Sequence, residues 1–139
     1  MTVKQLSVFI ENKPGTMVTI TNALGNAKVD IRAMSLADTQ DFGILRLMVN
    51  DTDKARAALS EIGCITSVTD VIAAAVPDTP GAMTEMIKLL SENGINIEYM
   101  YAFVAPEDNH AYVVFRVKET DKAVSVLKNA GIVLKNEIC

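Results

Sequence analysis

Tryptophan is absent from this sequence of 139 residues, and it has only one histidine and two cysteines. A metal site needs several such ligands at a recognisable spacing, and His110, Cys64 and Cys139 do not provide it. Neither thiol has a plausible base beside it in the sequence, and neither belongs to a CxxC motif. The sequence also lacks a Walker loop and a GxGxxG motif. We therefore expect no enzyme, no metal and no cofactor, and we expect reduced, structural thiols in a cytoplasmic protein.

An excess of positive charge is also missing. Lysine and arginine number 13 against 17 acidic residues, so the net charge is −4 and the pI is about 4.9. Nucleic-acid binding depends on clustered Lys and Arg, so the composition disfavours that partner. The longest fully apolar run, residues 71–76, is far shorter than the ~20 residues of a membrane-spanning helix. Residues 1–5 contain no apolar signal-peptide core, so we expect neither a membrane partner nor export.

What the sequence does contain is an internal repeat. Pro14-Gly15-x-Met17 returns 66 residues later as Pro80-Gly81-x-Met83, and the segment 52–55 returns 68 residues later as 120–123. A repeat determines the architecture, so it is read first. We predict two domains, residues 1–69 and 70–139. Domains of this size bury a small fraction of their surface, so we expect the two units to pack on each other or on another chain.

Hydrophobic periodicity predicts the elements of the first unit. Strands are expected at residues 4–10, 29–36, 43–49 and 64–68, with a turn at 38–41. One helix follows the apolar stripe Met17, Ile20, Leu24 and Ala27, and the other follows Ala55, Ala58, Leu59 and Ile62. Asp51 or Thr52 is expected to cap the second helix, and Gly63 to end it.

The second unit repeats the same order. Strands are expected at residues 70–76, 95–104, 111–117 and 132–138, and residues 66–76 are also compatible with one continuous segment shared by both units. A turn is expected at 106–109, next to a solvated His110. The helices follow Met83, Met86, Ile87 and Leu90, and then Ala123, Val126, Leu127 and Ala130. The βαββαβ order predicts an α+β fold of two ferredoxin-like units, each an antiparallel sheet with helices on one face.

A polar loop precedes the first helix of each unit, Asn12-Lys13-Pro14-Gly15 and Asp78-Thr79-Pro80-Gly81. Proline fixes the entry into the helix, and glycine allows a ligand to approach the backbone closely. The first helix amides, beginning at Thr16 or Ala82, have no intrahelical partner and favour a carboxylate. The loop alone indicates a well-formed helix start more than a ligand site, and its recurrence in the repeat brings the two interpretations about level.

A second polar position accompanies each loop. Asp30 precedes Ile31, and Asn96 precedes Ile97, where the first helix of each unit returns to the sheet. Such a residue can hold a ligand or form an Asx turn at the start of a strand. The aspartates at positions 30 and 78 would suit an ammonium group and repel a carboxylate.

The segments 9–17 and 94–97 resemble the signature segments of ACT domains, the amino-acid-binding regulatory modules of enzymes such as aspartate kinase. The resemblance covers the chain once per repeat and is closest to proteins made of two ACT domains without a catalytic domain. It implies that ACT domains pair and bind an amino acid at their interface. The site residues that it implies are Asn12, Pro14, Gly15, Thr16, Asp30, Ile31, Asp78, Pro80, Gly81, Ala82, Asn96 and Ile97.

The hypothesis is therefore a non-catalytic, amino-acid-binding sensor or regulator. Its partners would be a free amino acid, a second copy that pairs through ACT sheets or helices, and a metabolic enzyme. A structural dimerisation module without a ligand is the main alternative. An acylphosphatase-like enzyme is disfavoured, because the loops carry Lys13 and Thr79 where that chemistry needs an arginine. Since Asn12 and Asp30 become Asp78 and Asn96 in the second unit, we expect unequal sites.

Overall fold

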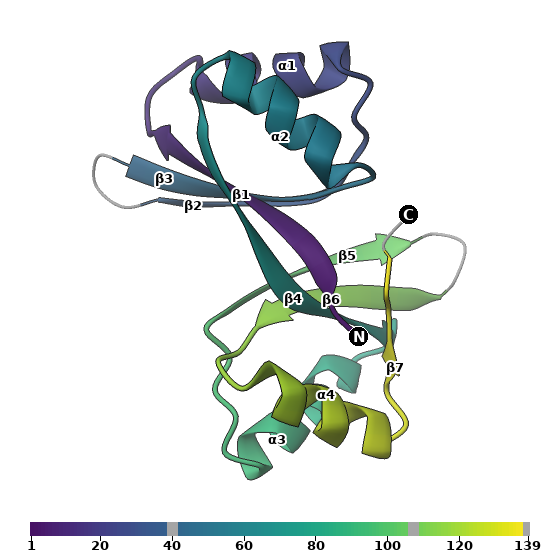
Figure 1. Ribbon diagram of the computed structural model, residues 1–139. Coiled ribbons are helices and arrows are strands. Elements are labelled where there is room, and N and C mark those ends of the chain that lie inside the picture. Colours follow the sequence, from purple (N-terminus) through teal and green to yellow (C-terminus); the bar gives the residue numbers. More distant parts are fainter. Residues whose placement is uncertain (39–41, 106–108, 138–139) are drawn as a thin grey trace. The chain divides into compact units, whose positions relative to one another are not determined.

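The fold was obtained as a computed structural model that describes residues 1–38, 42–105 and 109–137 (Figure 1). The chain divides into two compact units. The N-terminal unit contains Lys4–Thr69, and the C-terminal unit contains Asp70–Glu137 together with Met1–Val3. Each unit has its own antiparallel sheet and a pair of helices, as the repeat predicts.

In the N-terminal unit the helices α1 and α2 lie on one face of the sheet (Figure 1). The strand order is β2-β3-β1-β4, and β3 pairs antiparallel with both β1 and β2. This is the order that a ferredoxin-like unit requires. The elements are β1 (Val3–Glu11), α1 (Thr16–Asn26), β2 (Ile31–Asp38), β3 (Phe42–Val49), α2 (Thr52–Glu61) and β4 (Ile65–Pro77).

The C-terminal unit repeats this arrangement with α3 and α4 on one face of its sheet (Figure 1). Its strand order is β5-β6-β4-β7, so β4 takes the place that β1 has in the N-terminal unit. The elements that follow β4 are α3 (Ala82–Glu92), β5 (Tyr99–Ala105), β6 (His110–Arg116), α4 (Thr120–Asn129) and β7 (Val133–Leu134).

The two hydrophobic cores occupy the same positions of the repeat. Every buried residue of the N-terminal core has its repeat equivalent in the C-terminal core, with an offset of 66 or 68 residues. The match follows from alternation in the strands and from the i, i+4 spacing in the helices. The N-terminal core consists of Leu6, Val8, Ile10, Ile20, Leu24, Val29, Leu45, Leu47, Ala55 and Leu59.

Strand β4 belongs to both sheets. Separate strands were expected at residues 64–68 and 70–76, but one strand runs unbroken from Ile65 to Pro77. The continuous segment that the sequence also allowed is therefore the correct interpretation. The boundary between the compact units, after Thr69, falls inside this strand.

Two strands begin later than predicted, at Ile31 instead of residue 29 and at Tyr99 instead of residue 95. The amides of Val29 and Ile95 donate to the carbonyls of Leu24 and Leu90, at 3.0 and 2.9 Å. These bonds complete the C-terminal ends of α1 and α3. Because their amides bond to helix carbonyls, Val29 and Ile95 are buried without pairing in the sheet.

The closing strand and two helix positions also differ from the prediction. β7 contains only Val133–Leu134, and it begins after residue 132 because the Ile132 amide completes the end of α4 by donating to the Leu127 carbonyl at 3.0 Å. Ile62 and Ala130 were placed in buried stripes but are exposed. The turns expected at 38–41 and 106–109 fall mainly outside the described residues, although Asp38 is the last residue of β2. None of the helices in the described ranges has the length and apolar character of a membrane span.

The helix caps differ between the repeats, which gives a direct test. Asp51 caps α2, and its Oδ1 accepts the Lys54 amide at 3.1 Å, whereas Glu119 at the same position of α4 makes no such bond. Asp51→Ala is expected to lower the free energy of unfolding by about 1 kcal/mol in urea denaturation. Glu119→Ala, the matched control, is expected to change it by less than about 0.5 kcal/mol. Equal losses in the two variants would contradict a role for the Asp51 carboxylate.

Candidate functional site

Each Pro-Gly loop ends in a left-handed glycine that caps the following helix. Gly15 has φ 92° before α1 and Gly81 has φ 90° before α3, and neither helix receives a side-chain cap. The first amides of the two helices point back into the loops: Thr16 donates to the Lys13 carbonyl at 3.4 Å, and Ala82 to the Thr79 carbonyl at 3.2 Å. The next amides have no partner within the helix, so they remain available to an anion.

The two loops differ in charge. In the N-terminal unit Lys13 pairs with Glu11 at 3.0 Å, and the first turn of α1 has no acidic residue. In the C-terminal unit the loop carries Asp78, and the first turn of α3 carries Glu85. The helix dipole attracts a carboxylate at either helix start. At the C-terminal loop, however, the acidic side chains of that loop also repel it. The N-terminal loop is thus the better place for a carboxylate, and the C-terminal loop for an ammonium group.

Asp30 is held by its neighbours. Its amide donates to Asn50 Oδ1 at 2.9 Å, its carbonyl accepts the Asn50 amide at 3.1 Å, and its carboxylate contacts Arg32 Nη1 at 3.3 Å. The pair with Arg32 is exposed, so a ligand ammonium could compete for the carboxylate at small cost. Asn96, the repeat equivalent of Asp30, is exposed in the connection before β5.

The predicted site residues fall into two groups within each unit. Asn12, Pro14, Gly15 and Thr16 form one loop, as do Asp78, Pro80, Gly81 and Ala82 in the other unit. The pairs Asp30–Ile31 and Asn96–Ile97 lie beyond the far ends of α1 and α3, and both isoleucines pack against their unit's core. Each helix has 11 residues, which corresponds to about 16 Å of length. A single unit therefore does not bring its two groups together around one small ligand.

Each unit has a hollow at the end of the sheet next to its Pro-Gly loop. The N-terminal hollow has a volume of about 390 Å³ and the C-terminal hollow about 630 Å³. Five positions of the repeat line both. They are Phe9, Ile10, Glu11, Phe42 and Ile65 in the N-terminal unit, and Ala75, Val76, Pro77, His110 and Val133 in the C-terminal unit.

The hollows extend in different directions. The N-terminal one continues towards the end of β2, at Ala37 and Asp38. The C-terminal one continues along α3, past Ala82, Glu85 and Leu89. Sequence analysis identified Ala82 as a site residue but not the other residues of these linings. The sequence pattern that could have revealed the hollows is a set of apolar residues at strand ends that recur at the repeat offset. Whether these residues surround one space depends on the strand register, which the pattern does not give.

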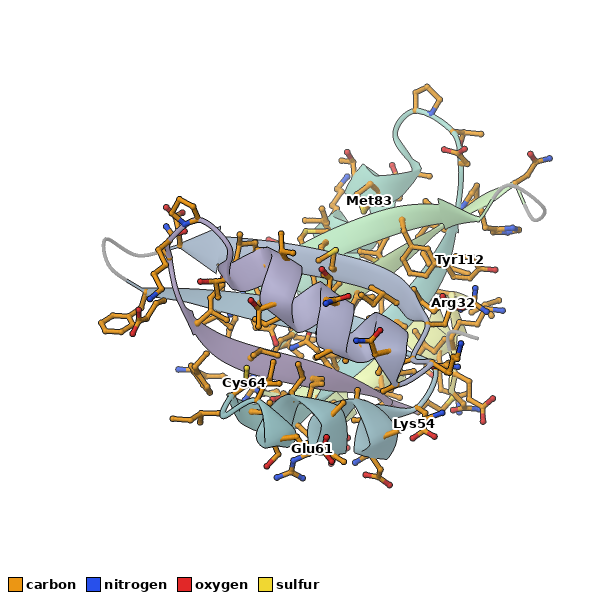
Figure 2. The ribbon with its side chains drawn as sticks, turned by 90° about the horizontal axis from the view of Figure 1, so that it is seen from above. Arg32, Lys54, Glu61, Cys64, Met83 and Tyr112 are labelled. Atoms are coloured by element: carbon orange, nitrogen blue, oxygen red, sulfur yellow. The ribbon has the colours of Figure 1, made fainter. Side chains whose placement is uncertain are left out.

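Cys64 follows α2 and is half-buried (Figure 2). Burial raises the pKa of the Cys64 thiol above its ordinary value, so the thiol keeps its proton and is a poor nucleophile. Among the described residues, no three His, Cys, Asp or Glu side chains gather closely enough to hold a metal ion. His110, at the start of β6, is exposed as expected.

Comparison with known proteins gives one family and several structural neighbours. The family model described as "ACT domain pair" matches residues 1–138. The crystal structure of protein BT0572 from Bacteroides thetaiotaomicron is 40% identical with a TM-score of 0.91, over 97% of this chain and 92% of that one. No curated protein sequence matches significantly.

Two further neighbours share the fold at lower identity. The ligand-free regulatory subunit of aspartate kinase from Thermus thermophilus is 17% identical, with a TM-score of 0.66 over 91% of each chain. Aspartate kinase from Synechocystis is 22% identical with a TM-score of 0.58, over 93% of this chain and 26% of that chain. These two likenesses concern the fold alone.

The left-handed glycines make a prediction about stability. A Cβ at Gly15 would meet no atom within 4 Å, so Gly15→Ala tests backbone conformation alone. It is expected to lower the free energy of unfolding by about 1 kcal/mol, because a side chain disfavours positive φ. Gly25→Ala is the control inside α1, where the added methyl is equally unobstructed and a helical alanine is expected to stabilise by about 0.5–1 kcal/mol. Thermal or urea unfolding measures both, and the same sign for both would contradict the interpretation.

The raised pKa of Cys64 leads to a prediction about how its alkylation depends on pH. In a Cys139→Ser background, alkylation of Cys64 by iodoacetamide is expected to reach half its maximal rate at a higher pH in the folded chain than in urea. Since the folded pKa is raised, the contribution of this thiol to stability is complete below its unfolded pKa and declines as the pH rises through the folded pKa. An alkylation midpoint at or below the value in urea would contradict this assignment.

Proposed function

This chain belongs to the ACT-domain-pair family, and on that premise we propose that it is a non-catalytic regulator that binds a free amino acid. The proposed domains are residues 1–69 and 70–139. The observation that carries the proposal is the pair of hollows at equivalent places of the repeat, each beside a Pro-Gly loop with available helix amides. Concave, mainly apolar sites with a few convergent polar groups are typical of small-molecule binding.

The proposed binding mode assigns each end of the ligand to a different chemistry. The α-carboxylate would lie on the amides that follow Gly15 or Gly81, where the helix dipole favours an anion. The ammonium group would lie near Asn12, Asp78, Asp30 or Asn96. The carboxylates of Asp30 and Asp78 are exposed. The ligand-free protein therefore does not have to bury their charge without a partner.

A complete site is proposed to need two ACT domains. The loop group and the Asp30 group of one unit lie at opposite ends of a helix about 16 Å long, whereas an amino acid is shorter than that. A ligand that contacts both kinds of residue must therefore join groups from different domains. We propose that a homodimer, formed through the sheets or helices, provides such interfaces in a cytoplasmic protein.

Regulation then follows from linkage. A ligand that contacts two domains binds the paired arrangement more tightly than the separated one, and it shifts the equilibrium by that difference in affinity. The proposed output is a change in assembly or in binding to a metabolic enzyme. A second candidate function is a dimerisation module without a ligand, which the exposed apolar side chains Phe9, Phe42 and Ile65 favour.

The primary test is thermal unfolding of the full chain with each of the twenty amino acids at millimolar concentration. At a hundredfold excess over Kd, one bound ligand adds about 2.7 kcal/mol of stability. Asp30→Asn and Asp78→Asn are expected to weaken the response about tenfold in Kd if either carboxylate holds the ammonium. Asp53→Asn, an exposed acid in the first turn of α2, is the control and should leave the Kd unchanged.

Two outcomes separate the candidate functions. A shift with one or a few amino acids, lost in an aspartate variant but not in Asp53→Asn, supports the regulator. Absence of any shift, together with a dimer in sedimentation at micromolar concentration, would reject the regulator and support the dimerisation module.

A further inference from the structure

The N-terminal hollow lies where the two repeats differ in side-chain volume. In β2 and β3, Ala37 lies opposite Ile44, and in β5 and β6 the equivalent partners are Phe103 and Tyr112. Both pairs are on the face of their sheet that has no helices, because Leu45 and Val113, one residue further along, belong to the cores. The same place in the fold therefore carries two aromatic rings in one unit and two aliphatic side chains in the other.

The C-terminal unit fills this place with its own residues. The rings of Phe103 and Tyr112 stack with centroids 5.3 Å apart, and Lys135 Nζ lies 5.3 Å from the centre of the Tyr112 ring. Tyr112 is 8% exposed. The described residues at the equivalent place in the N-terminal unit are the smaller Ala37 and Ile44, and the space beside them is part of the hollow of about 390 Å³.

The walls of the N-terminal hollow are apolar and open to solvent. Phe9, Phe42 and Ile65 converge on it from three strands and are 48%, 63% and 70% exposed. Large apolar side chains that gather in one concave place, instead of being scattered, indicate a binding site. The volume lies near the lower end of the range of about 300–1,000 Å³ for small-molecule sites.

The polar groups of the N-terminal hollow have one sign of charge. Among the described residues of its lining, Glu11 and Asp38 are the ionisable ones, and both are acidic. Lys13 pairs with Glu11 at 3.0 Å but is not part of the lining, and the pair is exposed and therefore weak. An acidic rim around an apolar wall repels an acidic side chain and accepts an apolar one. The C-terminal hollow, by contrast, contains Glu85, Lys88, Glu92 and His110, so its lining selects no single charge.

We propose that the N-terminal hollow seats the side chain of an apolar amino acid, while the main chain of that amino acid binds at the neighbouring Pro-Gly loop. This inference rests on the proposed function and specifies the class of its effector. The hollow begins at Glu11, the last residue of β1, and the Pro-Gly loop follows it directly, so both recognition elements meet at one end of the sheet. Leucine, isoleucine, methionine and phenylalanine are the expected ligands. Aspartate and glutamate are excluded by repulsion, and serine has too little apolar surface.

The experiment is isothermal titration of the full chain with leucine, phenylalanine, serine and aspartate, combined with a variant that fills the hollow. Ala37→Phe introduces the side chain that the C-terminal unit carries at this position. It is expected to weaken binding of the apolar amino acids at least about tenfold, the effect of losing one or two buried methylene groups. Ala57→Phe makes the same substitution on the exposed face of α2 and is the matched control for folding and binding.

A second variant removes a wall instead of filling the space. Phe42→Ser replaces an exposed apolar side chain, so it should fold, and it is expected to weaken leucine and phenylalanine binding while leaving the melting temperature of the free protein within a few degrees. Amide chemical shifts of β1 and β3 on titration with leucine locate the ligand. The proposal predicts that the largest changes occur at Phe9, Phe42 and Ile44.

The outcomes distinguish this proposal from the function on which it rests. Preference for apolar amino acids, lost in Ala37→Phe and kept in Ala57→Phe, supports it. If a polar or acidic amino acid binds best, or if Ala37→Phe binds the apolar ones as the wild type does, the hollow is not the side-chain site, while amino-acid binding itself stands. If no amino acid binds the wild-type chain, the proposed function fails and this inference fails with it.

Discussion

Strand β4 is the constraint on which both units depend. Its first residues close the N-terminal sheet beside β1, and its later residues begin the C-terminal sheet between β6 and β7. Side chains alternate between the faces along the whole strand, so a slip of one residue in either sheet would exchange the side chains of the two faces in that sheet. The run from Val71 to Val76 is apolar on both faces of the sheet. The alanines at positions 73–75 keep the side chains in its middle small.

The sequence predicted the architecture well because the repeat supplies each observation twice. The element order, the cap at Asp51 and the central buried positions of all four helices follow from local patterns that recur at a fixed offset. The strand starts near Val29 and Ile95 were wrong because apolar character does not reveal whether an amide serves the sheet or the end of a helix. The hollows were beyond prediction for a different reason. Phe9, Phe42 and Ile65 come from three strands, and only the register shows that they surround one space beside Ala37.

The repeat conserves the core positions but not the surface chemistry. Equivalent core positions keep apolar side chains, whereas Phe42 becomes His110, Ala37 becomes Phe103 and Phe9 becomes Ala75 at the ends of the sheets. The Pro-Gly loops show the same division, with a common left-handed glycine but different charges around it. Two units of one fold therefore present two different surfaces at the same place of the repeat.

The double role of β4 also has a meaning in time. During synthesis, residues 65–69 leave the ribosome before residues 70–77, and domains generally fold from the N-terminus onwards. The N-terminal sheet can thus acquire its last strand before the C-terminal sheet has more than its first. Once the first half of β4 is paired, the chain continues from it in an extended conformation. Part of the backbone entropy of the second half of β4 has then already been lost. The first unit then acts as a template from which the second begins to fold.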